Sequence, residues 1–170
     1  SPIREGGRLI LSTKDIEVIF GVSQWKGPAM LEVTGNGTFS LMTRLENPSG
    51  LFTNTNCATE KRLLNVEGVN SVDKSYLRLI NTTDQELPEV RASLYTKSGD
   101  VVGAAGTVLV DALAPKEQIW ITHQTLVEKF GPDWSEVAML EIHAGSGIKL
   151  INLNYSSQQE TFFNFSCSED

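Results

Sequence analysis

Residues that build metal sites and nucleophile sites are scarce in this sequence. It holds two Cys and two His, His123 and His143, among 170 residues, whereas a structural zinc site needs three or four such ligands at characteristic spacings. No Gly-x-Ser-x-Gly segment marks a nucleophile. We therefore predict no metal, no cofactor and no enzymatic activity, and we interpret the histidines as surface or helix-start residues. A triad assembled from distant residues leaves a hydrolase site at the loop ends as a hypothesis.

Basic residues are also few. Lys and Arg total 14 against 21 Asp and Glu, so the formal net charge is -7, which disfavours nucleic-acid binding and docking on an anionic membrane. No apolar run approaches the roughly 20 residues that a spanning helix needs, so we predict no membrane insertion. The sequence begins Ser1-Pro2 without Met and without a signal peptide, which indicates a processed or trimmed piece.

Strand-forming and turn-forming residues, by contrast, are plentiful. The chain has 13 Val, 10 Ile and 14 Thr beside 14 Gly, 10 Asn and 15 Ser, a balance typical of an all-β domain with short strands. Apolar and polar residues alternate in several segments, which places the apolar residues on one face of each strand. These patterns predict strands at 76–80, 90–95, 101–102, 107–110 and 119–121, with a turn at 97–100.

One short helix is predicted in each half of the chain. Ser12 and Asp15 fit a capping box, and Gly21 provides the stop of the first helix. Thr122 and Gly131 bound the second helix in the same way. Elsewhere no helical period is sustained over three turns.

The front and back thirds of the sequence resemble each other. Segments 29–32 and 138–141 both read Ala-Met-Leu-Glu, and a Trp precedes each at the same offset. Further matches run in order along both thirds at a nearly constant offset, which chance does not explain. The structural positions that match are Phe20, Gly21, Trp25, Met30 and Leu31 in the first copy and Phe130, Gly131, Trp134, Met139 and Leu140 in the second. We expect the two copies to adopt like conformations in like surroundings.

This repeat predicts the domain organisation. Residues 1–60 match 111–170, whereas 76–110 have no counterpart in front. We predict a partial β-sandwich repeat at 1–60, with its last four strands and a helix, a linker at 61–74, and a complete sandwich repeat at 75–170. Because a half sandwich with an open apolar face is not stable alone, three arrangements stay open: a piece of a tandem array, one larger sandwich with approximate two-fold symmetry, or strands supplied by a second chain. We favour the tandem array.

The two cysteines, Cys57 and Cys167, occupy matching positions in the two copies. The second repeat has no other Cys, so a bridge within that repeat is impossible. In an oxidising compartment they can pair with each other if the equivalent ends of the copies lie together. A Cys57–Cys167 disulfide and two small buried thiols are therefore both open.

Three carboxylates, those of Asp84, Glu86 and Glu89, gather in one predicted loop. Carboxylates in a loop are ligands for calcium, but the twelve-residue loop with its glycine is missing here. We therefore interpret the cluster as a solvated acidic turn.

The three Trp residues are interpreted as packing residues. Trp25 and Trp134 match between the copies, and Trp120 aligns with Ile10, so all three positions read as apolar sites. A sugar-binding surface would instead need at least two exposed, coplanar aromatic rings.

The turns and strands of the second repeat follow the pattern of a known module. They comprise the strand 77–83, the hairpin 94–103, the segment 113–117 before a strand and the short helix that ends at Gly131, while the first repeat adds the closing hairpin 47–54. In these features the chain resembles immunoglobulin-like or fibronectin type III-like sandwich modules of secreted and cell-envelope bacterial proteins. The closing hairpin of the second repeat, 156–160, departs from that pattern.

The resemblance implies an all-β antiparallel sandwich in a secreted, periplasmic or cell-surface protein. The function we expect is a non-enzymatic one, as a structural spacer or as a protein-interaction domain. Its partner would be another protein or a second copy of the chain. Carbohydrate binding is the alternative.

Overall fold

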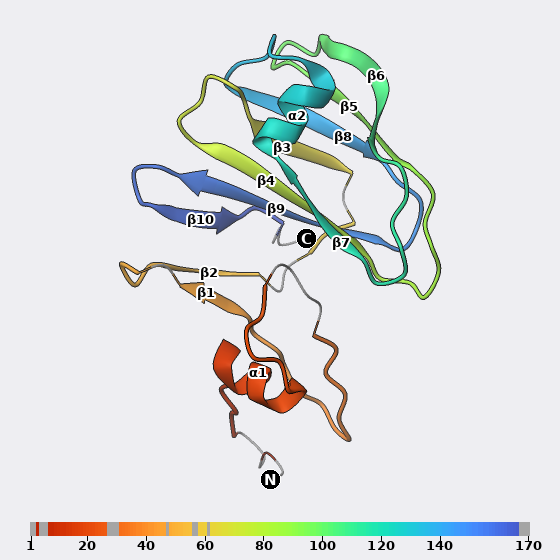
Figure 1. The fold of residues 1–170 in the computed structure, drawn as a ribbon. Coiled ribbons are helices and arrows are strands. Elements are labelled where there is room, and N and C mark those ends of the chain that lie inside the picture. Colours follow the sequence, from red (N-terminus) through yellow and green to blue (C-terminus); the bar gives the residue numbers. More distant parts are fainter. Residues whose placement is uncertain are drawn as a thin grey trace.

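The computed structural model describes residues 3, 7–26, 31–46, 48–55, 58–60 and 62–166. Figure 1 shows a sandwich at one end of the molecule, with a smaller part formed by the first third of the chain beside it. The elements in chain order are α1 (Thr13–Phe20), β1 (Arg44–Glu46), β2 (Phe52–Asn54), β3 (Leu63–Glu67), β4 (Lys74–Asn81), β5 (Val90–Tyr95), β6 (Val101–Val110), β7 (Gln118–Thr122), α2 (His123–Phe130), β8 (Val137–His143), β9 (Ile148–Ser156) and β10 (Thr161–Asn164).

Two antiparallel four-stranded sheets form the sandwich, with strand orders β10-β9-β4-β7 and β3-β8-β5-β6. Burial alternates along β4, and Leu77 and Leu79 point into the core, as the two-residue period of a strand requires. The same core contains Ala92 and Leu94 of β5 and Leu140 of β8, all fully buried. The predicted all-β antiparallel sandwich with one short helix per repeat is confirmed.

Helix α2 covers the side of the sandwich where β6 and β7 are the edge strands of the two sheets. Its N-cap Thr122 accepts a hydrogen bond of 3.2 Å from the backbone N–H of Thr125. Leu126 and Phe130 are buried in the core, which stabilises a helix too short to persist alone. Both predicted helices are confirmed. In the part of the chain that the structure describes, neither helix is long and apolar enough to cross a membrane.

Strand β6 is continuous where the sequence predicted two segments, 101–102 and 107–110. It pairs with β5, and the register shifts between Ala92 and Leu94 of β5. Gly103 and Gly106 in β6 adopt positive φ angles, a conformation that other residues reach only with strain. The strand therefore passes through a bulge instead of ending.

The sandwich begins inside segment 61–74, which we predicted to be a linker. Strand β3 occupies Leu63–Glu67 and pairs with β8, from Leu63 opposite Glu141 to Glu67 opposite Val137. Its alternate residues Leu64 and Val66 are buried in the core. A short edge strand whose partners lie far along the chain has little local pattern to distinguish it from a linker.

The first third of the chain reproduces the module's local structure. Asp15 donates its backbone N–H to the Ser12 hydroxyl at 3.2 Å, as Thr125 does to Thr122 in the second copy. Helix α1 then ends at Gly21, which adopts the left-handed conformation. The two helix caps therefore lie at corresponding positions of the copies, as the repeat requires.

The β1–β2 hairpin has the register of the β9–β10 hairpin. Arg44 pairs with Asn54 in the first copy. In the second copy Leu153, the repeat match of Arg44, pairs with Asn164, the repeat match of Asn54. The other two residue pairs of β1 and β2 follow the same rule. The additional residue of the second copy falls in the turn between its strands, so this gap in the sequence match lies in a turn.

The copies differ wherever the module needs distant strands. Strands β1 and β2 form a sheet of their own, so the described residues do not form the larger two-fold sandwich that we left open. Leu31 is exposed and lies outside any strand, whereas its match Leu140 is buried in β8. Strand β8 is held between β3 and β5, and residues 31–43 have no described strand beside them. The expectation of like surroundings is therefore wrong at Leu31, and the described part of segment 1–60 forms two of the four predicted strands.

We predict that Gly103→Ala destabilises the sandwich more than Gly106→Ala. Both positions have a positive φ, but a Cβ at Gly103 would lie 2.8 Å from the carbonyl oxygen of Phe130, whereas a Cβ at Gly106 would meet no atom within 4 Å. The matched pair isolates the close approach of α2 to β6. Urea unfolding should show a free energy of unfolding lower by a further ~1–3 kcal/mol for Gly103→Ala, and equal losses would contradict this packing.

Candidate functional site

The outward face of the β10-β9-β4-β7 sheet carries an aromatic surface. Tyr76 of β4 contacts the ring of Phe162 of β10 with ring centroids 5.4 Å apart and an angle of 76° between the rings. Tyr155 of β9 contacts the same Phe162 at 5.4 Å and 59°. The first contact is edge-on and the second is tilted. Together they join three strands, but they give no flat stacking platform. Tyr76 and Tyr155 were not among our predicted site residues, although alternation along β4 places Tyr76 opposite Leu77.

Trp120 lies on the same outward face and departs from our prediction of a buried packing residue. It pairs with Arg78 of β4, whose guanidinium carbon lies 5.3 Å from the centroid of the Trp120 ring. Partial burial against this surface lowers the pKa of the Arg78 side chain from its ordinary value. Ile121, one residue on, faces the core, so the two-residue period of β7 directs Trp120 outward.

A shallow hollow of about 320 Å³ adjoins this face at the start of α2, lined by Lys74, Tyr76, Thr122, His123 and Gln124. His123 is the first residue of α2, as predicted. Its Nε2 lies 3.4 Å from Lys74 Nζ. Burial first, and then the positive charge of Lys74, lower the pKa of His123, while the backbone of Glu67 opposes that shift.

The second histidine lies on the outward face of the other sheet. His143 Nε2 is 3.4 Å from Glu141 Oε2, which also accepts a hydrogen bond of 3.0 Å from the Tyr95 hydroxyl. These contacts, the Tyr95 hydrogen bond first, lower the pKa of Glu141. Ser93, the cross-strand neighbour of Glu141, instead accepts a hydrogen bond from the Gly106 N–H at 3.0 Å. The structure therefore places His143 beside Glu141, which in turn binds the Tyr95 hydroxyl.

Two of the three carboxylates in the predicted acidic loop form separate ion pairs. Asp84 lies 3.2 Å from Lys116, and Glu89 lies 2.7 Å from Arg91. Both pairs are exposed, so each contributes little to stability. Within the described ranges, no group of three or more His, Cys, Asp or Glu residues is placed to hold a metal ion.

A second hollow, of about 360 Å³, lies at the opposite side of the sandwich, beside the edge strand β3. The Asn152 side chain on its wall donates a hydrogen bond of 2.9 Å to the carbonyl oxygen of Asn65, and the Ser166 hydroxyl accepts one of 2.6 Å from the Asn152 N–H. The first contact ties β9 to β3 across the gap between the sheets, and the second ties β9 to the residues that follow β10. We interpret this hollow as the open side of the sandwich.

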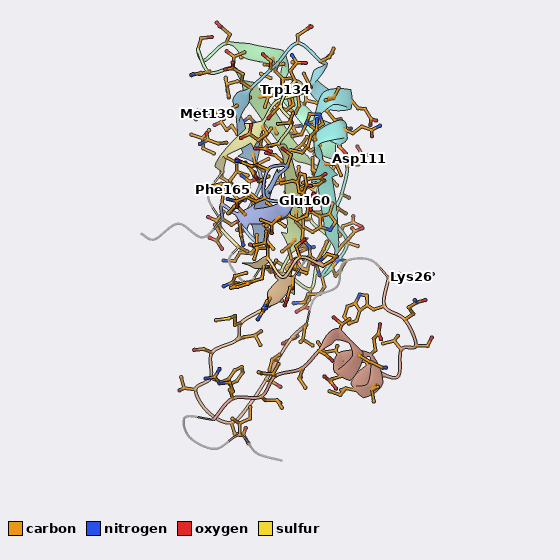
Figure 2. The ribbon with its side chains drawn as sticks, turned by 90° about the vertical axis from the view of Figure 1, so that its left-hand side faces the viewer. Lys26, Asp111, Trp134, Met139, Glu160 and Phe165 are labelled. Atoms are coloured by element: carbon orange, nitrogen blue, oxygen red, sulfur yellow. The ribbon has the colours of Figure 1, made fainter. Side chains whose placement is uncertain are left out.

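The repeat-matched residues lie in very different environments in the two copies. In the second copy Phe130, Trp134 and Leu140 are buried, and Figure 2 shows Trp134 among closely packed side chains. In the first copy Phe20 and Leu31 are exposed. The remaining matched residues are Gly131 and Met139, which are half-buried, Gly21, which is exposed, and Trp25, which is half-buried and donates its backbone N–H to Glu17 at 2.8 Å.

Three predicted residues, Cys57, Cys167 and Met30, lie outside the described residues. Asn54 and Asn164 each lie three residues before a cysteine. The Asn164 side chain donates a hydrogen bond of 2.9 Å to the Asn54 carbonyl oxygen. The equivalent hairpins of the two copies therefore touch. The disulfide between Cys57 and Cys167 stays a prediction.

The chain as a whole exposes more surface than its mass requires. Its accessible surface is 11345 Å², whereas a compact monomer of 18.7 kDa exposes about 8,300 Å². Most of the large apolar residues that are exposed belong to the first third, where they include Leu9, Ile10, Val18, Ile19, Phe20, Phe39, Leu41, Met42 and Phe52. This apolar surface of the first third is the most unusual feature of the molecule, because soluble monomers rarely leave such patches uncovered.

No protein-family model, curated protein or solved structure matches this chain. Any function must therefore be argued from the surfaces of the molecule itself.

We predict that His123 is neutral in the folded protein at pH 7 and titrates below its ordinary value of about 6.5. Because the folded state disfavours the charged imidazole, the stability contributed by the neutral form is complete above about pH 6.5 and is lost as the pH falls toward the folded-state pKa. Lys74→Met should raise the pKa of His123, since it removes the nearby positive charge. An NMR titration of the ring protons checks both statements, and a pKa that does not respond to Lys74→Met would contradict the contact.

Proposed function

We propose that this chain is a non-enzymatic β-sandwich module of a secreted or cell-envelope protein, and that it acts as a protein-interaction domain. The apolar surface of the first third is the observation that carries this proposal. The immunoglobulin-like character and the envelope location rest on the resemblance of the strand and turn motifs. A role as a spacer alone is less favoured, because a spacer between domains has no need of an uncovered apolar surface.

The size of the surface supports a protein partner. The excess over a compact monomer is roughly 3,000 Å² on this one chain, which is more than the about 800 Å² that each partner buries in a standard interface. The exposed residues are aliphatic and aromatic, among them Ile10, Ile19 and Phe20. Burial of such side chains drives association through the hydrophobic effect, without the basic residues that nucleic-acid binding requires.

We predict that a photo-crosslinking amino acid at Phe20 forms polypeptide adducts in cells of the natural host. Phe20 lies in the apolar surface, so its partner should be within reach of the label. The control position is Ser98, which is exposed in the turn between β5 and β6. Adducts at Phe20 and none at Ser98, seen on denaturing gels, support the proposal. Equal or absent adducts at both positions contradict it.

Carbohydrate binding is the second candidate, and the position of Trp120 is the observation that favours it. Its side chain points outward from β7, and the residue is 37% exposed beside Arg78. The edge-on packing of Tyr76 against Phe162 argues against a flat sugar platform. An interaction with a single sugar ring would therefore depend on Trp120.

For this second candidate we predict glycan-array signals that Trp120→Ala abolishes and that Tyr95→Phe, on the other sheet, retains. Loss of the stacking ring removes the main contact with a sugar face, while the Tyr95 variant controls for non-specific surface binding. An array without signals, or signals that survive Trp120→Ala, would eliminate carbohydrate binding at this face.

A further inference from the structure

We propose that residues 7–55 are the second half of a sandwich module, and that their partner is a polypeptide of four strands patterned like β3–β6, residues 63–110. The inference rests on the proposed function and names the chemistry of the partner. The recognition would consist of β-sheet pairing and burial of alternate leucine and valine side chains.

The described residues of segment 7–55 already have the local structure of the second half of the module. Helix α1 has the cap of α2, and the β1–β2 hairpin has the register of β9 and β10. Segment 8–12 corresponds to β7, with Leu9 and Leu11 at the positions of Ile119 and Ile121. This segment is described without strand structure. Strand β7 pairs with β4 alone, and the first third contains no described equivalent of β4.

Matched residues are buried in one copy and exposed in the other. Phe130 is 4% exposed and Phe20 is 62% exposed, while Leu150 is 0% exposed and its match Leu41 is 50% exposed. Since these side chains are identical in type, their own chemistry does not cause the difference. The difference follows from what surrounds them.

Four neighbours of these buried residues in the second copy come from one segment, although the backbone of Leu150 also pairs with Thr59. The backbone of Phe130 approaches Gly103 of β6, Leu150 pairs with Leu79 of β4, and Leu140 lies between Leu64 of β3 and Leu94 of β5. All four covering residues fall between 63 and 110. A partner with the same alternation would therefore cover Phe20, Leu41 and Leu31 in the same way.

A second copy of this chain does not supply these strands. Its own 63–110 segment already covers its own α2, β8 and β9, so exchange between two chains would expose one second half for each first half that it covers. The partner must bring an additional set of strands.

The test adds a duplicate of residues 62–110 directly in front of Ser1 of the whole 170-residue chain, because Ser1 corresponds to Asp111 in the repeat. A control fusion carries Leu77→Ser and Leu79→Ser in the added segment only. Chymotrypsin cleavage after Phe20 is then followed by mass spectrometry in the chain alone and in both fusions. Cleavage within the sandwich after Tyr155 of β9, which lies outside the duplicated segment and therefore occurs once in each of the three proteins, serves as the internal reference.

We expect cleavage after Phe20 to slow at least about tenfold in the fusion, since a covered site must open before it is cut, and to stay unchanged in the control fusion. An unchanged rate, or an equal fall in both fusions, overturns the inference. A fall in the chain alone that grows with its concentration assigns the surface to a second copy and also overturns it. Cross-linking at Phe20 in host cells does not depend on the fusion, so adducts there beside a failed fusion would leave the proposed function standing.

Discussion

The pairing of β8 between β3 and β5 is the constraint on which the rest of this structure depends. A central strand satisfies its backbone groups only when both neighbours are present, and its apolar residues become buried only when the opposite sheet covers them. In the second copy β8 has both, and Leu140 and Ile142 lie in the core. In the first copy Leu31 and Val33, of nearly the same sequence, are exposed. The same residues thus give a strand or an open segment according to their neighbours.

Features set by local interactions could be predicted from the sequence. The caps at Ser12 and Thr122 and the turn at 97–100 need only residues close in the chain, and alternation was enough to find β4 and β5. Strand β3 was missed because it forms only by pairing with Val137–Glu141, which lie far along the chain. Repeat matching located corresponding positions correctly, but it carried no information about whether distant strands were present to cover them.

The candidate surfaces also combine features that the sequence predicts with features that depend on distant strands. The repeat identified the residues of the apolar surface, Phe20 and Leu31 among them, but it did not predict their exposure, which depends on the strands that lie beside them. The aromatic face of β4, β9 and β10 joins Tyr76 to Phe162, which are distant in the sequence and whose contact depends on strand order. We predicted Trp120 to be a core residue because it matches Ile10 in the repeat. In the structure β7 is an edge strand, and Trp120 lies on its outward face.

The most direct test of the account compares amide hydrogen exchange of 31–33 with that of 140–142 in the same sample of the 170-residue protein. The two segments read Leu-Glu-Val and Leu-Glu-Ile, so differences in exchange report mainly their surroundings. We predict that the amides of 140–142 exchange at least about a thousand-fold more slowly, because they open only with the sandwich. Equal protection of the two segments would show that the first copy is covered without added strands, which contradicts the account.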